Sequence, residues 1–412
     1  MLANTNRAKL RAAIWDRLEA SEPEMLALCQ QLIRTPSVNG ADPEEKVAQV
    51  ISEALIARQL SPEMPVYEPG RPNVLASLGQ GDEGILFVGH MDTVPVGDGS
   101  KWSFDPFAAT IQDGRLYGRG ACDNKAGITI AITLLGILKE WEHALPGRVL
   151  LCCVPDEETG ATGRIGIRPL LRDGYLAANQ AIYTYPGLDL LCIGHRGLVR
   201  ILVKAKGEST HTGGETWESG RSGANAVTAL AELLLSLEKW RPAYQAHPAF
   251  PGRRPVVTPG TLIQGGEMES MVPANAQALI DMRTLPGQEA KDLLGEIRSF
   301  AKKVQQRRPG IHFEVEKLID VPAVSIPPET PIVSALARWT ERLTGQKPEI
   351  AGAGPANEGY LLIGAGIPTI CGFGPPGGNA HAADEYVEVE GLLQTAKIYA
   401  AAVLDLLVPN NL

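Results

Sequence analysis

Four short segments of the 412-residue sequence carry the histidines and carboxylates best suited to bind a metal. Each segment lies beside a strongly apolar stretch or in a loop that follows one. The segments are GHMDTVP (His90, Asp92), GRGACDNKAG (Asp123), PDEETG (Glu157, Glu158) and GNAHAADEYV (His381). Ligands of open α/β sheets bind just outside the carboxyl ends of the strands. We therefore expect these side chains to meet at one edge of a sheet.

Imidazole and carboxylate groups together favour Zn, Mn or Co, whereas carboxylates alone would suit Mg or Ca better. Asp92 stands two residues after His90 in an extended segment, so both side chains point to the same side. Its carboxylate can accept one imidazole N–H and leave the other ring nitrogen for a metal. Each pattern is weak alone, because a lone histidine usually lies in an ordinary loop. The ordered set predicts a divalent metal site, since bunched carboxylates repel one another without a cation.

The apolar pattern predicts the elements that position these residues. Helices are expected over 7–35 and 46–59, buried strands over 85–90 and 149–154, and a long buried helix over 126–142 between the two strands. Strand, helix, strand in this order indicates an α/β fold with an open, mostly parallel sheet flanked by helices.

The pattern changes near Gly197, where LVRILVKAKGES alternates apolar and polar residues as a half-exposed antiparallel strand does. Helices over 224–238 and 288–307, with strands near Thr261 and over 276–283, indicate a small inserted α+β domain. The α/β pattern resumes by residue 331. We predict a main domain made of residues 1–197 and 318–412, and an inserted domain of residues 198–317.

Composition excludes several classes of protein. With 44% hydrophobic residues and a net charge of −9, the chain is neither disordered nor suited to general binding of nucleic-acid backbones. The longest apolar run, ITIAITLLGIL, is too short to span a membrane, and the amphipathic start shows no secretory signal. Six cysteines without CxxC spacing indicate reduced thiols. We expect a cytoplasmic protein with no membrane or nucleic-acid partner.

The ordered motifs resemble the metallopeptidase family of aminoacylases, acetylornithine deacetylase, succinyl-diaminopimelate desuccinylase and glutamate carboxypeptidase. The resemblance runs from LIRTPSVNG through GHMDTVP, LYGRGACDNKAG, PDEETG and GESTHTGG to GIPTICGFGP and AHAADEYVEV, nearly the whole chain. It implies a metal-dependent hydrolase that cleaves a C–N bond in a small carboxylate-bearing substrate. The main domain would be catalytic, and the inserted domain would be a lid and dimerisation domain.

The resemblance also implies roles for individual residues. Asp123 would bridge two metals, with Glu158 and His381 completing one site and His90 belonging to the other. Asp92 would orient His90, and Glu157 would be the general base that activates water and returns the proton to the leaving nitrogen.

Two residues of the inserted domain match functional positions of this family. His211, in GESTHTGG, would reach across a homodimer, or a larger homo-oligomer, to polarise the scissile carbonyl. Arg283, in LIDMRTLPG, would pair with a substrate carboxylate, a bidentate task that suits arginine. Considered without the family, His211 would be an exposed strand-end histidine and Arg283 part of a surface ion pair.

Three positions depart from the family pattern. Tyr185 stands where a carboxylate normally binds the second metal, and a phenol is a poor ligand at neutral pH. We expect one firm metal site and a weak or absent second site, although the nearby Asp189 could substitute. Ser270 replaces a usual Asn, and Asn357, beside Glu358, replaces a usual Asp. Because these departures lie near the expected substrate, we count Tyr185 and Asn357 as substrate-binding candidates.

The sequence leaves three hypotheses for the function of this protein. Peptide or N-acyl amino acid cleavage is the usual chemistry of the family. Removal of an amino group from an aromatic acid is an alternative that Tyr185 leaves open. A binding protein that has lost catalysis would be expected to lose its general base, yet Glu157 is present with the full set of metal candidates.

Overall fold

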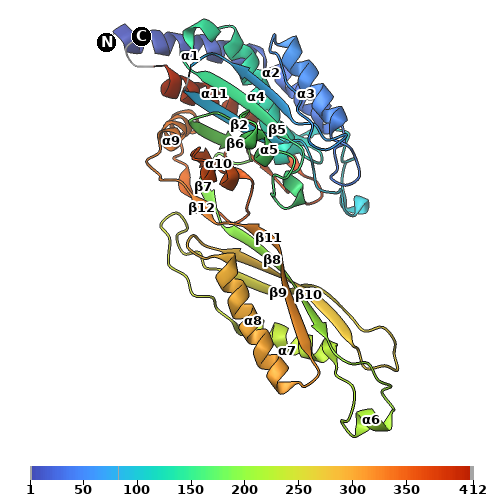
Figure 1. The fold of residues 1–412 in the computed structure, drawn as a ribbon. Coiled ribbons are helices and arrows are strands. Elements are labelled where there is room, and N and C mark those ends of the chain that lie inside the picture. The colour runs from blue at the N-terminus through green and yellow to red at the C-terminus, as the bar shows by residue number, and fades with distance from the viewer. Residues whose placement is uncertain (1, 82, 409–412) are drawn as a thin grey trace. The chain divides into compact units, whose positions relative to one another are not determined.

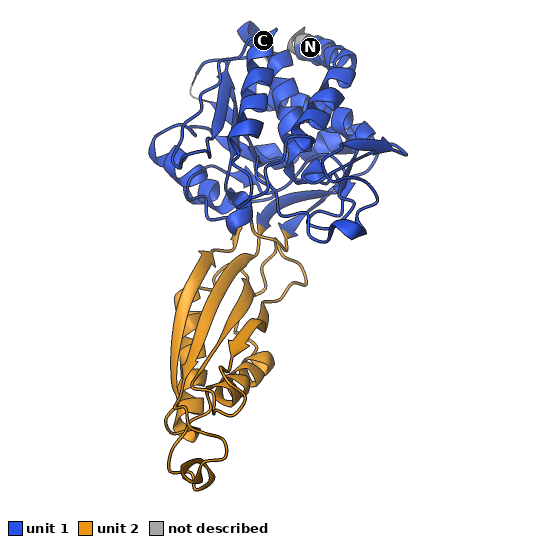
Figure 2. Cartoon of the chain, turned by 90° about the vertical axis from the view of Figure 1, so that its right-hand side faces the viewer, with its two compact units in different colours: residues 1–194, 325–352, 357–412 blue, residues 195–324, 353–356 orange. Residues whose placement is uncertain are grey.

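The computed structural model describes residues 2–81 and 83–408 and divides into two compact units (Figure 2). Unit 1 contains residues up to Gly194, Ser325–Gly352 and the chain from Asn357 onward. Unit 2 consists of His195–Val324 with Ala353–Ala356, so it extends a few residues beyond the predicted range 198–317 at both ends.

Unit 1 is built on a five-stranded sheet with the order β1-β5-β2-β6-β14. The strand β2 pairs in parallel with both β5 and β6, and β6 pairs in parallel with β14, whereas β1 is antiparallel to β5 at the edge. The strands are β1 (Val74–Leu78), β2 (Gly84–His90), β5 (Arg148–Val154), β6 (Gln180–Tyr183) and β14 (Thr369–Ile370). This confirms the predicted α/β class with an open, mostly parallel sheet.

Helices cover both faces of this sheet (Figure 1). They are α1 (Leu2–Ala20), α2 (Glu22–Ile33), α3 (Glu45–Ala57), α4 (Ala126–Lys139), α5 (Ile167–Arg172), α9 (Pro331–Thr344), α10 (Gly359–Gly364) and α11 (Val389–Leu407). Alternate residues of β2 face opposite sides, so Leu86 and Val88 share a core with α5 and α10, while the Phe87 ring lies 5.0 Å from Tyr399 of α11. A strand covered on both faces must be apolar at every position, which explains its unbroken apolar sequence.

The close approach of α4 to β2 depends on Gly89. A Cβ atom added there would lie 2.6 Å from both the Asn124 side-chain oxygen and Ile128 Cγ1. Contacts that short do not occur, so only glycine lets this helix lie directly against the strand end. The segment Ala121–Lys139 is long and apolar enough to cross a membrane, but 94% of its most apolar window is buried inside the protein. Its apolar sequence is accounted for by the core of unit 1.

The described residues also form two smaller sheets. One has the order β15-β16-β4-β3, and the other has the order β12-β7-β13. Their strands are β3 (Thr110–Gln112), β4 (Arg115–Tyr117), β7 (Leu190–His195), β12 (Val324–Ser325), β13 (Glu349–Ala353), β15 (Gly377–Gly378) and β16 (Tyr386–Glu388). The sequence reading did not anticipate either sheet, because most of these strands have only two or three residues.

Unit 2 is an antiparallel sheet with the order β11-β8-β10-β9, packed against two helices. Its elements are β8 (Gly197–Lys206), α6 (Glu215–Glu218), α7 (Ala226–Lys239), β9 (Val256–Gly265), β10 (Asn275–Thr284), α8 (Ala290–Arg307) and β11 (His312–Val321). Val199, Ile201, Val203 and Ala205 of β8 are all buried against these helices, as the period-two pattern predicts. The predicted α+β character of this segment is therefore confirmed.

Candidate metal centre

His90 is the last residue of β2 and is fully buried. Its Nδ1 lies 2.9 Å from the backbone oxygen of Asp92, which can only accept, so Nδ1 carries the proton. The Asp92 carboxylate is farther, with Oδ1 3.5 Å from Nδ1. The nearest partner of Nδ1 is therefore the Asp92 backbone carbonyl rather than the carboxylate that the sequence analysis expected to orient the imidazole. The ring's Nε2 faces Asp123, with Oδ1 2.8 Å away.

The Asp92 carboxylate instead holds the loop that carries the two glutamates. Its Oδ1 accepts the backbone N–H of Glu157 at 3.3 Å, and its Oδ2 accepts that of Glu158 at 3.0 Å. The Asn39 amide donates to Oδ2 at 2.7 Å. Asp92 thus joins the end of β2 to the end of β5, where the short turn Glu157–Thr159 begins.

Asp123 lies in the irregular turn Ala121–Lys125, between β4 and the start of α4. The turn is held by Glu385, which the sequence analysis did not predict as a site residue. Glu385 Oε1 accepts the backbone N–H groups of Cys122 at 3.1 Å and Asp123 at 3.0 Å, and Oε2 accepts that of Gly120 at 3.0 Å. The buried Arg119 guanidinium neutralises Glu385 at 2.6 Å. The only sequence signal was its position in AHAADEYV, four residues after His381.

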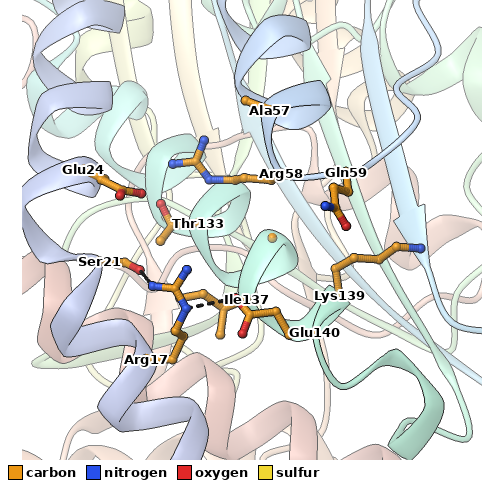
Figure 3. Close-up of a pocket in the computed structure, with 11 residues that line it drawn as sticks. Arg17, Ser21, Glu24, Ala57, Arg58, Gln59, Thr133, Ile137, Lys139 and Glu140 are labelled. Carbon is orange, nitrogen blue, oxygen red and sulfur yellow. Dashed lines mark hydrogen bonds and ion pairs between the residues drawn. The ribbon is translucent and has the colours of Figure 1, made fainter.

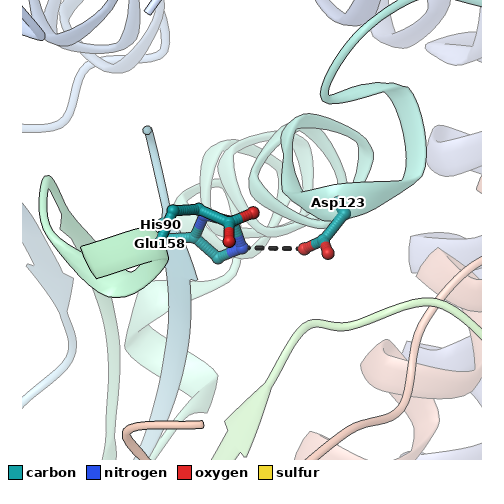
Figure 4. A group of neighbouring side chains, drawn as sticks. All are labelled: His90, Asp123 and Glu158. Atoms are coloured by element: carbon teal, nitrogen blue, oxygen red, sulfur yellow. Dashed lines mark hydrogen bonds and ion pairs between the residues drawn. The ribbon is translucent and has the colours of Figure 1, made fainter. Parts of the chain in front are cut away.

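The four predicted metal-binding side chains converge. His90, Asp123 and Glu158 offer ligand atoms that all lie within 4.8 Å of one another (Figure 4). Asp123 Oδ1 lies 2.8 Å from His90 Nε2, and its Oδ2 lies 3.3 Å from His381 Nε2. His381 Nε2 is also 2.9 Å from Glu158 Oε1. Asp123 is therefore shared between the two histidines, with one oxygen facing each.

Electrostatics in this group are dominated by buried carboxylates. Burial raises the pKa of Glu157 to about 8, opposed by His90 and reinforced by Glu158, Asp123 and Asp92. Burial acts to lower the pKa of His90, but hydrogen bonding to Asp123 and Asp92 raises it well above its usual value. The pKa of His381 is raised to about 10 by Asp123 and Glu158. The site thus has an excess of negative charge that draws protons onto its bases.

This donor set fits a divalent metal. Two imidazole nitrogens and two carboxylates face one another, and a divalent cation would take the place of the protons that this negative charge draws onto the histidines. Because Nδ1 donates to the Asp92 backbone carbonyl, displacement of the Nε2 proton by a bound cation would leave Nε2 as the ligand atom.

Tyr185 lies against this group from the side of His90. Its ring centroid is 5.5 Å from that of His90 and 5.0 Å from that of Tyr183, on which it stacks. Burial and the nearby Glu157 and Asp123 carboxylates raise the pKa of Tyr185 well above its usual value, so the phenol stays neutral. Asp189 is exposed, and the cation-binding group found in the described chain does not include it.

Asn357 is placed differently from our prediction of a substrate contact. Its side chain is 7% exposed, its Nδ2 donates to the backbone oxygen of Cys371, and its Oδ1 accepts the backbone N–H of Gly359 at 2.9 Å. These bonds fix the start of α10 to the strand region after β14. The structure therefore gives Asn357 a structural task and offers no support for substrate binding.

Unit 2 carries the other two candidates. His211 is exposed, and its Nδ1 accepts the Gly213 backbone N–H at 3.0 Å, so its Nε2 carries the proton and can donate outward. Arg283 is partly exposed and donates from Nε to Asp281 at 2.9 Å. This is the surface ion pair that the sequence analysis gave as the alternative to substrate binding. The two Nη groups of Arg283 make no hydrogen bond within the described chain.

The ends of β2 and β5 and two adjoining loops gather imidazoles, paired carboxylates and the buried Glu157, an arrangement typical of metal-dependent hydrolases. Comparison with known proteins narrows this class. Residues 86–405 match the sequence profile of Peptidase family M20/M25/M40, and the chain belongs to this family. It is thus a metal-dependent hydrolase acting on C–N bonds.

The chain is similar to curated relatives over most of its length. It is 30% identical to succinyl-diaminopimelate desuccinylase of Rhodospirillum centenum over 92% of this chain and 96% of the relative. It is 27% identical to acetylornithine deacetylase of Photorhabdus laumondii over 94% of this chain and 99% of the relative. The fold resembles the di-peptidase Dug1p from Saccharomyces cerevisiae with a TM-score of 0.76 at 15% identity, covering 95% and 98% of the two chains.

Proposed function

We propose that this protein hydrolyses the amide bond of an N-acylated amino acid or a small peptide that carries a free carboxylate. The observation that carries the proposal is the convergence of His90, Asp123, Glu158 and His381 beside the otherwise unassigned Glu157. Curated relatives that span nearly the whole chain are named for removing acyl groups from amino acids, which supports the same class.

Asp123, Glu158 and His381 would hold one divalent cation, Zn, Mn or Co, with His90 on the other side of Asp123. The cation would supply a Lewis acid that polarises a substrate carbonyl and lowers the pKa of water towards about 7. A second site beside His90 would lack the carboxylate that Tyr185 replaces, so we propose that a single cation is bound in use.

Glu157 is proposed as the general base. It is 7% exposed and is not among the grouped ligand residues. A bound cation would lower its raised pKa, so that the ionised carboxylate could take a proton from the attacking water. The same oxygen would return the proton to the leaving nitrogen. Asp92 positions this base through the hydrogen bond from the Glu157 backbone.

The residues of unit 2 would bind the rest of the substrate. We propose that the Nε2–H of His211, fixed as a donor by Gly213, stabilises the developing oxyanion in the site of a partner subunit. The free Nη groups of Arg283 would take the substrate carboxylate. The protein would then function as a homodimer or a larger homo-oligomer.

An aromatic amino acid is a second candidate substrate, with loss of its amino group as the reaction. The observation that favours it is the stacked pair Tyr183–Tyr185, which lies against His90 and could support a flat ring. The two candidates differ in their products, since one releases an acid and an amine and the other releases ammonia.

A substrate panel tests both candidates. Purified protein loaded with Mn, Co or Zn is incubated with N-acetyl and N-succinyl amino acids, dipeptides and aminobenzoates, and primary amine and ammonia are measured separately. Turnover of an acylated amino acid or dipeptide that disappears in Glu157→Gln supports the first candidate. Ammonia release from aminobenzoates alone would replace it by the second.

A further inference from the structure

Four arginines converge on a cavity of 430 Å³ in unit 1 that contains none of the metal-centre residues. The cavity lies between α1, α9 and α11 and is lined by Arg7, Arg11, Arg338, Arg342, Trp339 and Asp405, with Ala8. Four guanidinium groups thus face a single carboxylate, in a chain whose net charge is −9. Such a local excess of positive charge requires an explanation.

The single carboxylate is already fully engaged. Asp405 pairs with Arg7 at 3.5 Å, accepts a hydrogen bond from Arg338, and accepts the indole N–H of Trp339 at 2.6 Å. Arg11 and Arg342, in contrast, make no ion pair and no hydrogen bond with any described part of the chain. Among the described residues, these two guanidinium groups at the cavity therefore have no ion-pair partner.

Their orientation is fixed by aromatic rings. The Arg11 guanidinium carbon lies 4.4 Å from the centroid of Trp339 and 5.6 Å from that of Trp15, and the Arg342 carbon lies 4.9 Å from that of Trp339. The two indoles meet edge to face, and Trp15 is anchored by a hydrogen bond to the Lys397 backbone at 3.0 Å. Stacking occupies the flat faces of the guanidinium groups and leaves their N–H edges free to donate.

The like charges affect one another. Burial lowers the pKa of Arg11, and Arg342 and Arg7 lower it further, against the opposing effect of Asp405. In another cavity of unit 1, shown in Figure 3, the cationic side chains lie close to carboxylates. There Arg17 pairs with Glu140 at 2.9 Å, Lys139 pairs with Glu142, and Arg58 has the charge of Glu24 nearby. Of these two cavities, the arginine cavity has the larger excess of cationic side chains.

We propose that this arginine cavity binds a phosphate group. A phosphate carries close to two negative charges at neutral pH and offers several acceptor oxygens to fixed guanidinium edges. It would neutralise most of the excess charge without requiring new backbone geometry. The phosphate could be the free ion or part of a small organic ester, since the surrounding volume of 430 Å³ accommodates either.

Calorimetric titration of the metal-loaded protein, freed of unbound metal and kept at constant ionic strength, tests the proposal. The probes are inorganic phosphate and adenosine monophosphate, with citrate as a carboxylate comparison. Binding of either phosphate probe to the unaltered protein is expected, and the two arms distinguish the free ion from the ester. Absence of binding by both, or binding of citrate alone, would overturn the proposal.

Variants separate this cavity from the metal centre, which could also attract phosphate. Arg11→Gln and Arg342→Gln should each weaken phosphate binding at least about tenfold, because each removes an unpaired donor group. Arg172→Gln is the matched control, since Arg172 is exposed and already paired with Asp173. Unchanged affinity in both cavity variants would place the phosphate elsewhere and refute the assignment. Arg342 is itself exposed, so its variant is expected to fold even if the Arg11 variant does not.

Discussion

His381 Nε2 lies 2.9 Å from Oε1 of Glu158, although 223 positions separate the two residues in the sequence. One follows the end of β5, and the other lies in the loop between β15 and β16. His381 Nε2 also lies 3.3 Å from Asp123 Oδ2, and Glu158 offers a ligand atom within 4.8 Å of those of Asp123 and His90. A loop from the last part of the chain therefore completes a group of side chains whose first member, His90, ends β2. The metal centre therefore depends on both halves of unit 1 being folded together.

Replacing His381 should weaken metal binding directly. His381→Ala removes an imidazole from the group around Asp123 and Glu158, so metal retained after dialysis is expected to fall at least about tenfold. His143→Ala is a matched control, because His143 is exposed and lies in the turn Glu142–Ala144, which contributes none of the metal-centre residues. Metal content per chain, measured by elemental analysis, checks the prediction; equal retention in the two variants would contradict it.

Removing the metal should destabilise the protein. The cation would offset the repulsion among Asp92, Asp123, Glu157 and Glu158, and it binds the folded chain rather than the unfolded one. Treatment with a chelator is expected to lower the Tm by several degrees and to abolish turnover, and added Mn, Co or Zn should restore both. A Tm that does not respond to chelation would argue against the site.

Tyr185 should control the number of metals. Tyr185→Glu places a carboxylate beside His90, and we expect the count at saturating metal to rise from about one to about two per chain. Tyr185→Phe keeps the ring and should leave the count unchanged. Two metals per chain in the unaltered protein would show that Tyr185 does not prevent binding of the second metal.

Glu385 should be a positioning residue for Asp123. Glu385→Gln breaks a buried pair with Arg119 and weakens the acceptor of three backbone N–H groups, so we expect a loss of about 3 kcal/mol in the free energy of unfolding. Metal affinity should fall as well, which a purely structural residue would not cause. Glu314→Gln, at an exposed pair with Lys206 in unit 2, is expected to change neither denaturant unfolding nor metal affinity. The role is wrong if the Glu385 variant keeps full metal affinity.

Mixing two inactive variants tests whether His211 acts across a subunit interface. Glu157→Gln and His211→Ala should each be inactive alone, but mixed dimers would contain one site with an intact base and a partner's intact histidine. Re-association of equal amounts is then expected to recover about a quarter of the full activity. No recovery, in mixtures shown by native mass spectrometry to contain heterodimers, would place His211 in the site of its own subunit.

The local patterns of the sequence were sufficient for much of the fold. The unbroken apolar run of β2 and the alternation in β8 each predicted the burial that the structure shows, because periodicity directly reflects which faces are covered. The short strands β15 and β16 could not be predicted, since two or three residues carry no period. The task of Asn357 could not be predicted either, because its partners Cys371 and Gly359 are set by how α10 meets the sheet.

By itself, the sequence determined which chemistry is available, because it supplies side chains that bind metals or transfer protons: His90, Asp123, Glu157, Glu158 and His381. The family resemblance added that Tyr185 stands where a carboxylate is usual. Tertiary structure alone decided how they act together. It placed the Asp92 carbonyl on His90 and its carboxylate on the glutamate loop, and it brought Glu385 under the turn of Asp123. It also gathered Arg11, Arg342 and Asp405 around one cavity. Hydrogen bonds and charge pairs between distant segments depend on the path of the whole chain, which no local spacing encodes.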